Sequence, residues 1–587
     1  MKNNNRPSYL MKRRLFYVVI IVSLLFFYIS ANYYKIQILQ KNFYTEKALA
    51  NQMKTFEIAA KRGNIFDRNG EKLAYSISRY RVYLDKRSFN IENRNELISI
   101  LGVSEEKFDY LYENKNNTYT LMRNIEQDIH DKLTIEDYDG IWMEDDSMRV
   151  YPNDDLASRV IGHTNVDSDG IVGIEYSLDS VLKGTNGTVR AKTDAIGRRL
   201  PYGNEEIINP INGSDVYLTI DEVIQHFTEK SIQKGLEKTG AKNVYAIVMD
   251  VKTGEILAMA STPTYNLNEP REKPEAISEE EYEELSDEKK VELWNENWKN
   301  PIVSNIFEPG STFKIVTAAI GLEENVVSPT TVFNEKTGYI NVYDRKIKCW
   351  YYPNHHGEET FVEAMENSCN PVFVKVGQSI GRDKFHDGLV KLGLNDEQTI
   401  ELPGVVEYKV REKNKIGPVE LATMSYGHGI SLTSIQLIRT LNAIINNGNL
   451  VEPTIIKKVI NNDDIVVNEN IGINKRKIIS DETSKNIKLM LESVVNNGSG
   501  KSANISGIRV GGKTGTTMKL ENGVYNEEKG IASFFGFAPV EDPEISVLVI
   551  VDEPKDSIYG SVVAAPIFKE IMESSLRQIG VKPNFKE

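Results

Sequence analysis

The sequence predicts a multi-domain α+β protein, with one N-terminal transmembrane helix, a mixed α/β region, and a C-terminal domain in which helices cover a sheet. Three observations predict this fold class. The 587 residues are too many for one hydrophobic core, so two or three domains are expected. An uncharged apolar run lies at residues 15–31. After residue 213 the order is strands, helices, strands and a final helix, which is typical of an α+β domain.

Composition narrows the class of protein. The hydrophobic content of 40% and the charged content of 26% are ordinary for globular proteins. A net charge of −14, without a basic stripe, argues against nucleic-acid binding. Two cysteines are too few for a disulfide scaffold, which leaves one disulfide or a metal site.

The N-terminal run "LFYVVIIVSLLFFYISA" continues through Asn32, Tyr33 and Tyr34 to about the 20 residues that span a bilayer. Basic residues precede it, and they predict a cytoplasmic N-terminus with the rest of the chain outside. These residues are Lys2, Arg6, Lys12, Arg13 and Arg14. The alternative is a cleaved signal peptide, for which the apolar region is long and "ISA" is a poor cleavage site.

The next elements precede the C-terminal domain. Residues 35–57 are polar and helix-like, which indicates a stalk. Residues 62–70, "RGNIFDRNG", predict strand, turn and strand, because Asn-Gly is a strong hairpin signal. A mixed region continues to about residue 205, and its segment 169–187 is glycine-punctuated with a helical middle.

The C-terminal domain begins with a strand and an amphipathic helix at 214–240. Residues 243–261 predict two apolar strands joined by a turn, and the charged residues 269–300 predict a solvated helical insertion. Helical segments then dominate to about residue 500. Three successive strands are predicted at 507–517, 530–540 and 544–554, followed by a helix at 563–580.

Three short motifs in this domain carry chemistry. "FEPGSTFK" at 307–314 places Ser311 three residues before Lys314, where i and i+3 share a helical face. Alone this motif is weak, since a serine at a helix start is commonly a cap and Ser-x-x-Lys also occurs elsewhere in the chain, for example at Ser104–Lys107, Ser180–Lys183 and Ser286–Lys289. Ser368-Cys369-Asn370 lies downstream in a helical region, and "KTGT" from Lys513 to Thr516 lies on a late strand. Because the three motifs occur in this order, at a helix start, in a helical region and on a late strand, together they indicate an active site more strongly than any one of them does.

At these motifs the chain resembles the serine penicillin-recognising enzymes. It is more closely similar to class B penicillin-binding proteins, the monofunctional peptidoglycan D,D-transpeptidases, and "KCWYYPNHHGEETFVEAMENSCNPVF" resembles Gram-positive members, including the stage V sporulation type. The segments 62–70 and 169–187, with the anchor, resemble the family's non-catalytic pedestal. The resemblance covers nearly the whole chain.

The resemblance implies an elongated pedestal and a transpeptidase domain with an antiparallel sheet. It implies a cytoplasmic tail at 1–14, a transmembrane helix at 15–34, a stalk and dimerisation-type pedestal at 35–212, and the transpeptidase domain at 213–587. Nothing in the sequence resembles a glycosyltransferase domain, which argues against a bifunctional class A enzyme.

The resemblance also implies roles. Ser311 is the nucleophile and Lys314 its base, because a desolvated lysine loses pKa and accepts a proton. Ser368 relays a proton to the leaving D-alanine, and Asn370 holds the substrate amide. Lys513 receives the substrate carboxylate, while Thr514, Gly515 and Thr516 bind substrate, with the N–H groups of Ser311 and Thr516 as the oxyanion hole. The family usually has Gly-Gln-Gly where Gly427-His428-Gly429 stands, and His428 is assigned no role.

The implied substrates are peptidoglycan stem peptides, with β-lactams as inhibitors, and the chemistry requires no cofactor. The implied partner is a polytopic membrane glycosyltransferase. Septal, elongation and spore cortex synthesis stay open. The alternatives are a D,D-carboxypeptidase, in which water replaces the amine, a β-lactamase, for which no deacylating base is identified, and a penicillin-binding sensor or scaffold.

Both cysteines lie in one short stretch. Cys349 and Cys369 flank His355 and His356, and thiolate and imidazole are the ligands of closed zinc sites. The spacing is not that of a standard zinc finger. We therefore expect a structural zinc site, with a disulfide or two buried thiols as the alternatives.

Overall fold

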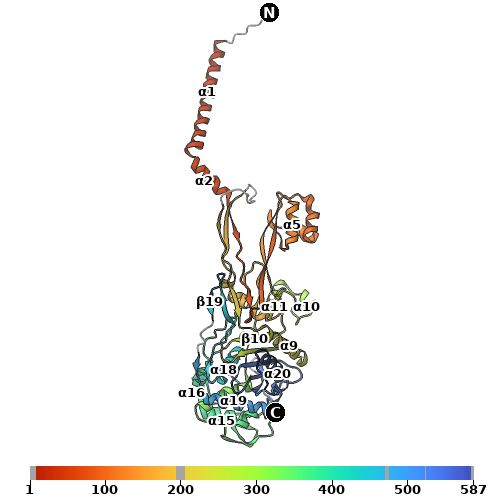
Figure 1. Ribbon diagram of the computed structural model, residues 1–587, viewed down its shortest axis with the longest axis vertical. Helices are drawn as coiled ribbons and strands as arrows, with labels where there is room; N and C mark the ends of the chain where they lie inside the picture. The colour runs from red at the N-terminus through yellow and green to blue at the C-terminus, as the bar shows by residue number, and fades with distance from the viewer. Residues whose placement is uncertain (1–7, 194–204, 470–474, 522–523, 584–587) are drawn as a thin grey trace. The chain divides into compact units, whose positions relative to one another are not determined.

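The computed structural model describes residues 8–193, 205–469, 475–521 and 524–583 (Figure 1). Two of the predicted N-terminal basic residues, Lys2 and Arg6, lie outside the described residues. The chain divides into two compact units. One unit comprises residues 1–60 and 185–212, and the other comprises residues 61–184 and 213–587.

The first unit contains the apolar helix. Helix α1, Tyr9–Tyr34, continues through a π-helical turn, Lys35–Leu39, and α2 is Lys41–Gln52. Within the stretch Tyr9–Leu39, an 18-residue window has a mean hydropathy of 2.2 and is not buried, so the helix is long and apolar enough to cross a membrane. The helix begins at Tyr9, before the apolar run at residues 15–31, and the Ser8 hydroxyl caps it by accepting a hydrogen bond from the Met11 N–H.

The stalk predicted at 35–57 is helical only to Gln52. Strand β1, Met53–Ile58, follows and pairs antiparallel with β6, Gly187–Lys192. The third strand of this small sheet is β7, Glu206–Ile208. Chain segments that are more than a hundred residues apart therefore form one sheet.

In the second unit, the predicted strand, turn and strand at residues 62–70 are confirmed. Strand β2, Ile65–Phe66, turns into β3, Lys72–Asp85. The Asp67 carboxylate accepts the N–H groups of Asn69 at 2.7 Å and of Glu71 at 2.9 Å, which closes the turn. The other elements of the mixed region are β4 Thr118–Ile125, β5 Ile141–Val150, α3 Arg94–Leu101, α4 Glu105–Asn114, α5 Gln127–Glu136, α6 Ser158–Ile161, α7 Gly173–Ser177 and α8 Asp179–Leu182.

A buried ion network links these elements. The Arg62 guanidinium donates to Glu175 and to Asp179, each at 2.7 Å, and Arg149 donates to the other oxygen of Glu175. Arg62 is 5% exposed and Glu175 is fully buried. A buried carboxylate of this kind requires both arginines, because an unpaired buried charge is strongly destabilising.

One sheet of the second unit has five antiparallel strands in the order β10-β9-β23-β22-β21. The strands are β9 Asn243–Asp250, β10 Ile256–Thr262, β21 Gly511–Glu521, β22 Val524–Ala538 and β23 Ile545–Asp552. The five strands predicted from apolar runs and turns are thereby confirmed. A second, mixed sheet continues from the β2–β3 turn through β8 Asp215–Leu218, β18 Ile456–Ile460 and β19 Val466–Glu469.

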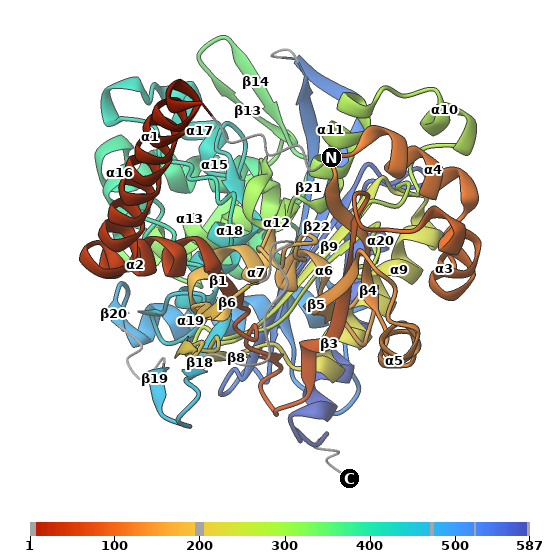
Figure 2. The ribbon, with the colours of Figure 1, turned by 90° about the horizontal axis from the view of Figure 1, so that it is seen from above.

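Helices cover both faces of the five-stranded sheet (Figure 2). Along β9, Val244, Ala246 and Val248 pack with α9, Glu222–Thr239, and α20, Gly560–Gln578. The alternate residues Tyr245, Ile247 and Met249 face the other core, which contains the helical layer. That layer includes α13 Lys314–Glu323, α18 Ser434–Ile445 and α19 Asp481–Asn496.

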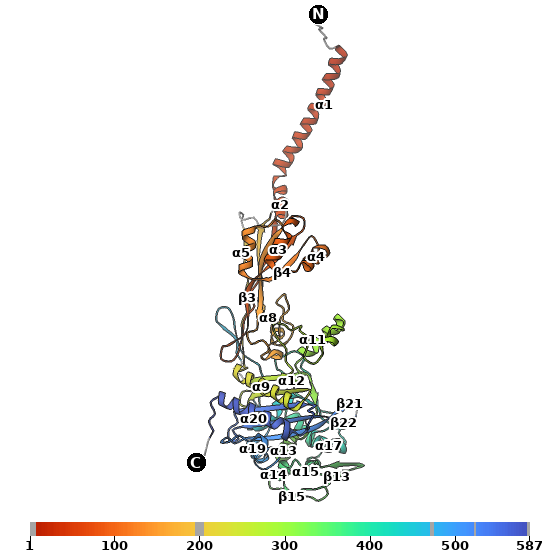
Figure 3. The same ribbon diagram turned by 90° about the vertical axis from the view of Figure 1, so that its right-hand side faces the viewer.

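Residues 269–300 form the predicted helical insertion, with α10 Glu279–Glu283 and α11 Asp287–Trp298 mostly exposed. Besides β18 and β19, the described residues of the region predicted as mainly helical to residue 500 contain four two-stranded sheets. They are β11 Ile306–Phe307 with β16 Leu432–Thr433, β12 Val332–Glu335 with β15 Gly357–Thr360, β13 Tyr339–Val342 with β14 Arg345–Lys348, and β17 Asn449–Leu450 with β20 Arg476–Lys477. The remaining helices are α12 Pro301–Ser304, α14 Phe361–Glu366, α15 Asn370–Ile380, α16 Arg382–Lys391 and α17 Pro418–Met424. Figure 3 shows β13 and β15 beside α14 and α15.

Candidate active site

Ser311 lies in a 3₁₀-helix, Gly310–Phe313, that leads directly into α13 at Lys314. A 3₁₀-helix has about three residues per turn, so Ser311 and Lys314 stand on one face. Gly310 has a φ of +56°, and a Cβ there would lie 2.8 Å from the Thr516 carbonyl oxygen. We call this 3₁₀-helix, Gly310–Phe313, the serine turn. Glycine at position 310 therefore allows the serine turn to approach strand β21.

Lys314 joins the first motif to the second. Its side chain is fully buried. The Nζ donates to the Ser368 carbonyl at 2.7 Å, to the Ser368 Oγ at 3.1 Å and to the Asn370 Oδ1 at 2.7 Å. In the described part of the chain, the hydrogen bonds of Lys314 go to these two residues rather than to the Ser311 Oγ. Burial lowers the pKa of Lys314 to about 8, because desolvation disfavours the ammonium.

Ser368 has an unusual backbone conformation for a serine. Its φ of +53° is in the left-handed region, which a serine seldom adopts and which costs free energy. This conformation brings both its carbonyl and its hydroxyl to Lys314. Asn370 begins α15, and its Nδ2 donates to the Lys348 carbonyl at 3.1 Å, which fixes the amide.

The third motif lies on β21, which is an edge strand of the five-stranded sheet. An edge strand presents unpaired N–H and C=O groups, to which an extended peptide can add. Lys513 is fully buried, and burial, with the nearby charge of Lys314, lowers its pKa well below the usual range. Thr514 is buried and its hydroxyl lies 3.2 Å from that of Ser499, while the Thr516 Oγ accepts the Gly560 N–H.

Gly515 allows the close contact between β21 and the serine turn. A Cβ at Gly515 would lie 2.3 Å from the Ser533 Oγ and 3.0 Å from the Pro309 carbonyl oxygen. Any side chain at this position would push the strand away from residues 309–311. The structure thus brings residues of all three predicted motifs close to one another: Lys314 contacts Ser368 and Asn370, and the serine turn lies against β21.

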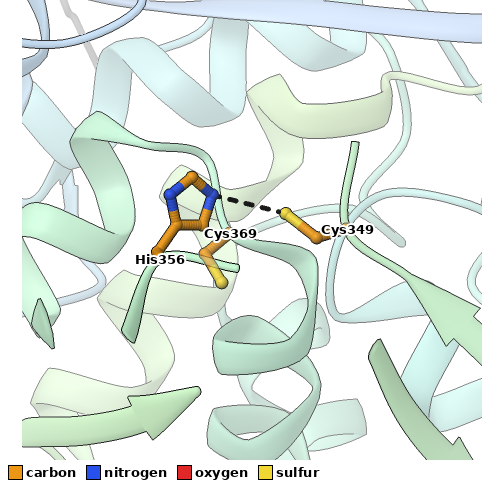
Figure 4. A group of neighbouring side chains, drawn as sticks. All are labelled: Cys349, His356 and Cys369. Carbon is orange, nitrogen blue, oxygen red and sulfur yellow. Dashed lines mark hydrogen bonds between the residues drawn. The ribbon is translucent and has the colours of Figure 1, made fainter. Parts of the chain in front are cut away.

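Three of the four predicted metal ligands form a cluster (Figure 4). The Sγ atoms of Cys349 and Cys369 and a ring nitrogen of His356 lie within 4.8 Å of one another, and the Cys349 Sγ is 3.5 Å from the His356 Nε2. Both cysteines are buried and free. Of the two histidines, one or both of which were predicted as ligands, His355 is exposed and lies outside this cluster.

The two thiols differ in acidity. Hydrogen bonding with Cys369 lowers the pKa of Cys349, and hydrogen bonding with Cys349 raises the pKa of Cys369. Cys349 is therefore the first of the pair to ionise. Hydrogen bonding to Cys349 also raises the pKa of His356.

Sequence reasoning missed Glu359. Its carboxylate is 3% exposed, and Oε1 has no hydrogen-bond partner, while Oε2 accepts from the Asn367 Nδ2 at 3.1 Å. After Cys349, Glu359 is among the groups that raise the pKa of Cys369, so it lies next to that thiol. An acidic residue ten positions after Cys349 offered no spacing signal in the sequence.

Comparisons with known proteins agree with this arrangement. Residues 244–573 match the family "Penicillin binding protein transpeptidase domain", and residues 57–218 match "Penicillin-binding Protein dimerisation domain". Stage V sporulation protein D of Bacillus subtilis is 35% identical over 559 residues, which cover 93% of this chain and 83% of that protein. Peptidoglycan D,D-transpeptidase FtsI of Buchnera aphidicola is 29% identical over 94% of this chain and 92% of its own length.

Solved structures are similar over most of the chain. Penicillin binding protein 3 from Mycobacterium tuberculosis, complexed with aztreonam, has a TM-score of 0.68 and 25% identity, and covers 90% of this chain and 98% of its own. Penicillin Binding Protein 2X from Streptococcus thermophilus has a TM-score of 0.71 and 25% identity, and covers 89% of this chain and 80% of its own. With family matches over most of its length and a relative of this identity, the chain belongs to the class B penicillin-binding proteins.

Proposed function

We propose that the chain is a peptidoglycan D,D-transpeptidase that cross-links stem peptides through an acyl-enzyme on Ser311. The observation that carries this proposal is the position of Lys314. A buried lysine with a lowered pKa contacts Ser368 and Asn370 and shares a face with Ser311. Such a lysine is suited to activate a serine nucleophile.

In the first step, neutral Lys314 takes the proton of the Ser311 hydroxyl. The Oγ attacks the carbonyl carbon between the two terminal D-alanines, and the N–H groups of Ser311 and Thr516 bind the oxyanion. Asn370 holds the substrate amide, and Lys513 receives the terminal carboxylate beside Thr514 and Gly515. The C–N bond then breaks, and the leaving D-alanine nitrogen takes a proton through Ser368.

In the second step, an amine of a neighbouring stem peptide attacks the ester carbon. The C–N bond of the cross-link forms, the bond to the Ser311 Oγ breaks, and an amine proton returns to that oxygen. A β-lactam acylates Ser311 in the same way as the first substrate. Hydrolysis by water would make the protein a D,D-carboxypeptidase, and binding without turnover would make it a sensor or scaffold.

The proposed location is the cytoplasmic membrane. The apolar helix Tyr9–Leu39 supports a single-pass anchor, and Lys12, Arg13 and Arg14 support an N-terminus inside. The catalytic domain then lies outside, where its substrate is. A polytopic membrane glycosyltransferase, bound through the anchor and pedestal, is the proposed partner, and the wall made is that of the septum or the spore.

Labelled penicillin tests the proposed function. The purified protein is expected to form a stable adduct and to release D-alanine from a stem peptide, and Ser311→Ala is expected to abolish both. Ser502→Ala, in a Ser-x-Asn sequence outside the site, is the control. Near-normal labelling of Ser311→Ala, or rapid release of the label from the unchanged protein, would contradict the assignment.

We further propose that Cys349, His356 and Cys369 hold a structural zinc ion. The cluster joins two thiols and one imidazole, which are the donors of closed zinc sites, and this supports the proposal. The ligand loops are tied to the catalytic loop. The Trp350 Nε1 donates to the Asn367 carbonyl at 2.8 Å, and the Asn370 Nδ2 donates to Lys348.

Zinc content separates this proposal from a disulfide. Elemental analysis of the purified ectodomain is expected to give about one zinc per chain, and chelation is expected to lower the melting temperature and slow acylation. His356→Ala is expected to lose the metal, whereas the adjacent His355→Ala keeps it. Absence of metal together with a Cys349–Cys369 disulfide in mass spectrometry would refute the zinc site.

A further inference from the structure

A second titratable cluster lies beside the nucleophile and has no role in the chemistry described above. Glu308 stands three residues before Ser311, and its side chain is 11% exposed. Its carboxylate accepts the Gly429 N–H at 2.9 Å and the Tyr525 hydroxyl at 3.1 and 3.3 Å. Its Oε2 lies 3.6 Å from the His428 Nδ1.

This carboxylate lacks a permanent cation. Within the described residues, its one ion-pair contact is with His428. Burial lowers the pKa of His428 to about 4, so the imidazole is neutral at physiological pH. Burial also raises the pKa of Glu308, and no lysine or arginine offsets that effect. The Gly429 and Tyr525 hydrogen bonds offset part of the effect of burial, and a cation from outside the described residues would stabilise the ionised carboxylate further.

The cluster adjoins the reacting serine on two sides. The Gly310 N–H donates to the Gly427 carbonyl at 3.0 Å, so the loop that carries His428 packs on the residue before Ser311. Tyr525 comes from the β21–β22 hairpin, whose first strand carries the Lys513 motif. Glu308 thus connects the serine turn, the Gly427–Gly429 loop and the hairpin.

Aromatic rings complete the surroundings. The ring of His428 lies 5.0 Å from that of Tyr426 and 5.8 Å from that of Tyr525. Tyr525 is 40% exposed, so the cluster opens to solvent on the hairpin side. A carboxylate that lies close to aromatic rings is suited to an ammonium group, through charge and through cation–π attraction.

We propose that Glu308, with Tyr525 and Tyr426, binds the primary ammonium group of the acceptor stem peptide. The inference rests on the proposed function, since it assigns the second substrate of that same site. It also distinguishes a transpeptidase from a D,D-carboxypeptidase, which is an alternative that the sequence leaves open. A carboxypeptidase transfers the acyl group to water and requires no anion for a cationic acceptor.

The chemistry balances with Glu308 as the first proton acceptor. The bound ammonium gives one proton to the carboxylate and becomes a neutral amine. Its nitrogen forms the new C–N bond as the ester C–O bond breaks, and the second proton passes from nitrogen to the Ser311 Oγ. The Glu308 carboxyl then returns its proton to water, and the enzyme is restored.

The test measures the partition of the acyl-enzyme, that is, the ratio of the product of transfer to an amine to the product of hydrolysis by water. The purified full-length protein is given a synthetic peptide ending in D-Ala-D-Ala and increasing amounts of a second peptide with a free primary amine. Glu308→Gln is expected to raise the acceptor concentration needed for half-maximal transfer by about tenfold or more, because a hydrogen bond to a charged group is lost. Penicillin acylation is expected to change much less than this partition.

Glu401→Gln is the matched control. Glu401 is also a largely buried carboxylate with a raised pKa, and it accepts one backbone N–H, from Ile455, and one hydroxyl, from Thr454. Its replacement is expected to leave the partition unchanged. Tyr525→Leu, on the hairpin rather than the serine turn, is expected to weaken acceptor use as Glu308→Gln does.

The outcomes separate the two proposals. If the unchanged protein neither binds penicillin nor releases D-alanine, the proposed function fails. If it does both, and Glu308→Gln and Tyr525→Leu retain the normal partition, the acceptor site is wrong. An equal loss in Glu401→Gln would also overturn it, since the effect would then be one of general stability.

Discussion

Two fully buried lysines, Lys314 and Lys513, face the same site. An unpaired ammonium in such a place is costly, and burial lowers the pKa of each. Lys314 has neutral oxygens of Ser368 and Asn370 as hydrogen-bond partners. The nearby acidic groups of Cys349, Cys369 and Glu359 offset part of the effect of burial on its pKa. The result is a base whose pKa is near the working pH, which is the condition for efficient proton transfer.

The rate of acylation by penicillin is therefore expected to rise with pH. Lys314 accepts a proton only when neutral, and with a pKa of about 8 the neutral fraction grows from about a tenth near pH 7 to about nine tenths near pH 9. Stopped-flow measurements on the ectodomain across this range check the profile. Lys314→Arg, which cannot deprotonate, is expected to lose the pH-dependent rate. A flat profile in the unchanged protein would exclude Lys314 as the base.

Among the elements, the Gly427–Gly429 loop packs against the serine turn and fixes its position. Gly427 has a φ of +87°, and a Cβ there would lie 1.9 Å from the Gly310 carbonyl oxygen. The contact is between two backbones, so neither side can yield by rotating a side chain. A change at this loop consequently reaches Ser311 through one residue.

Gly427→Ala is expected to slow penicillin acylation by roughly 100-fold, because a displacement of about 1 Å at a nucleophile has an effect of that size. Gly404→Ala is the control, since Gly404 has a φ of +75° but open space around its Cβ position. Both variants incur the left-handed strain of about 1–2 kcal/mol. Equal acylation rates in the two variants would show that strain, not the clash, is what matters.

Some helices and strands could be predicted well from the sequence and others poorly. Strands β9, β22 and β23 were predictable because they are long apolar runs bounded by turns. The pairs between residues 332 and 360 were not, because strands of four residues carry too few alternating positions. Glu359 could not be placed near the site either, because it reaches the site through pairing with Phe333, 26 positions earlier, which leaves no local pattern. Tyr525 lies in a local hairpin, and its contact with Glu308, 217 positions earlier, left no local pattern in the sequence.

Across the second unit, the pedestal part at 61–184 and the catalytic part at 213–587 share one hydrophobic core. Ile65, Tyr151 and Ile174 belong to the same cluster as Ile247 and residues of the helical layer. Strand β2 pairs parallel with β8, Ile65 opposite Val216. The Arg159 guanidinium donates to the Pro263 carbonyl at 2.6 Å, across the same boundary. A domain border at residue 213 would pass through this core.

Ile65→Ala is therefore expected to destabilise the catalytic part, although Ile65 lies in the pedestal. Its side chain is fully buried in the shared core, and truncation of a buried isoleucine costs about 2–5 kcal/mol. The measurement is the temperature at which the ectodomain loses penicillin binding. Leu97→Ala is the matched control, because Leu97 is equally buried but belongs to a separate cluster around α3. If Ile65→Ala leaves the temperature of binding loss unchanged, or if Leu97→Ala lowers it as much, the two parts melt independently and the shared core does not couple them.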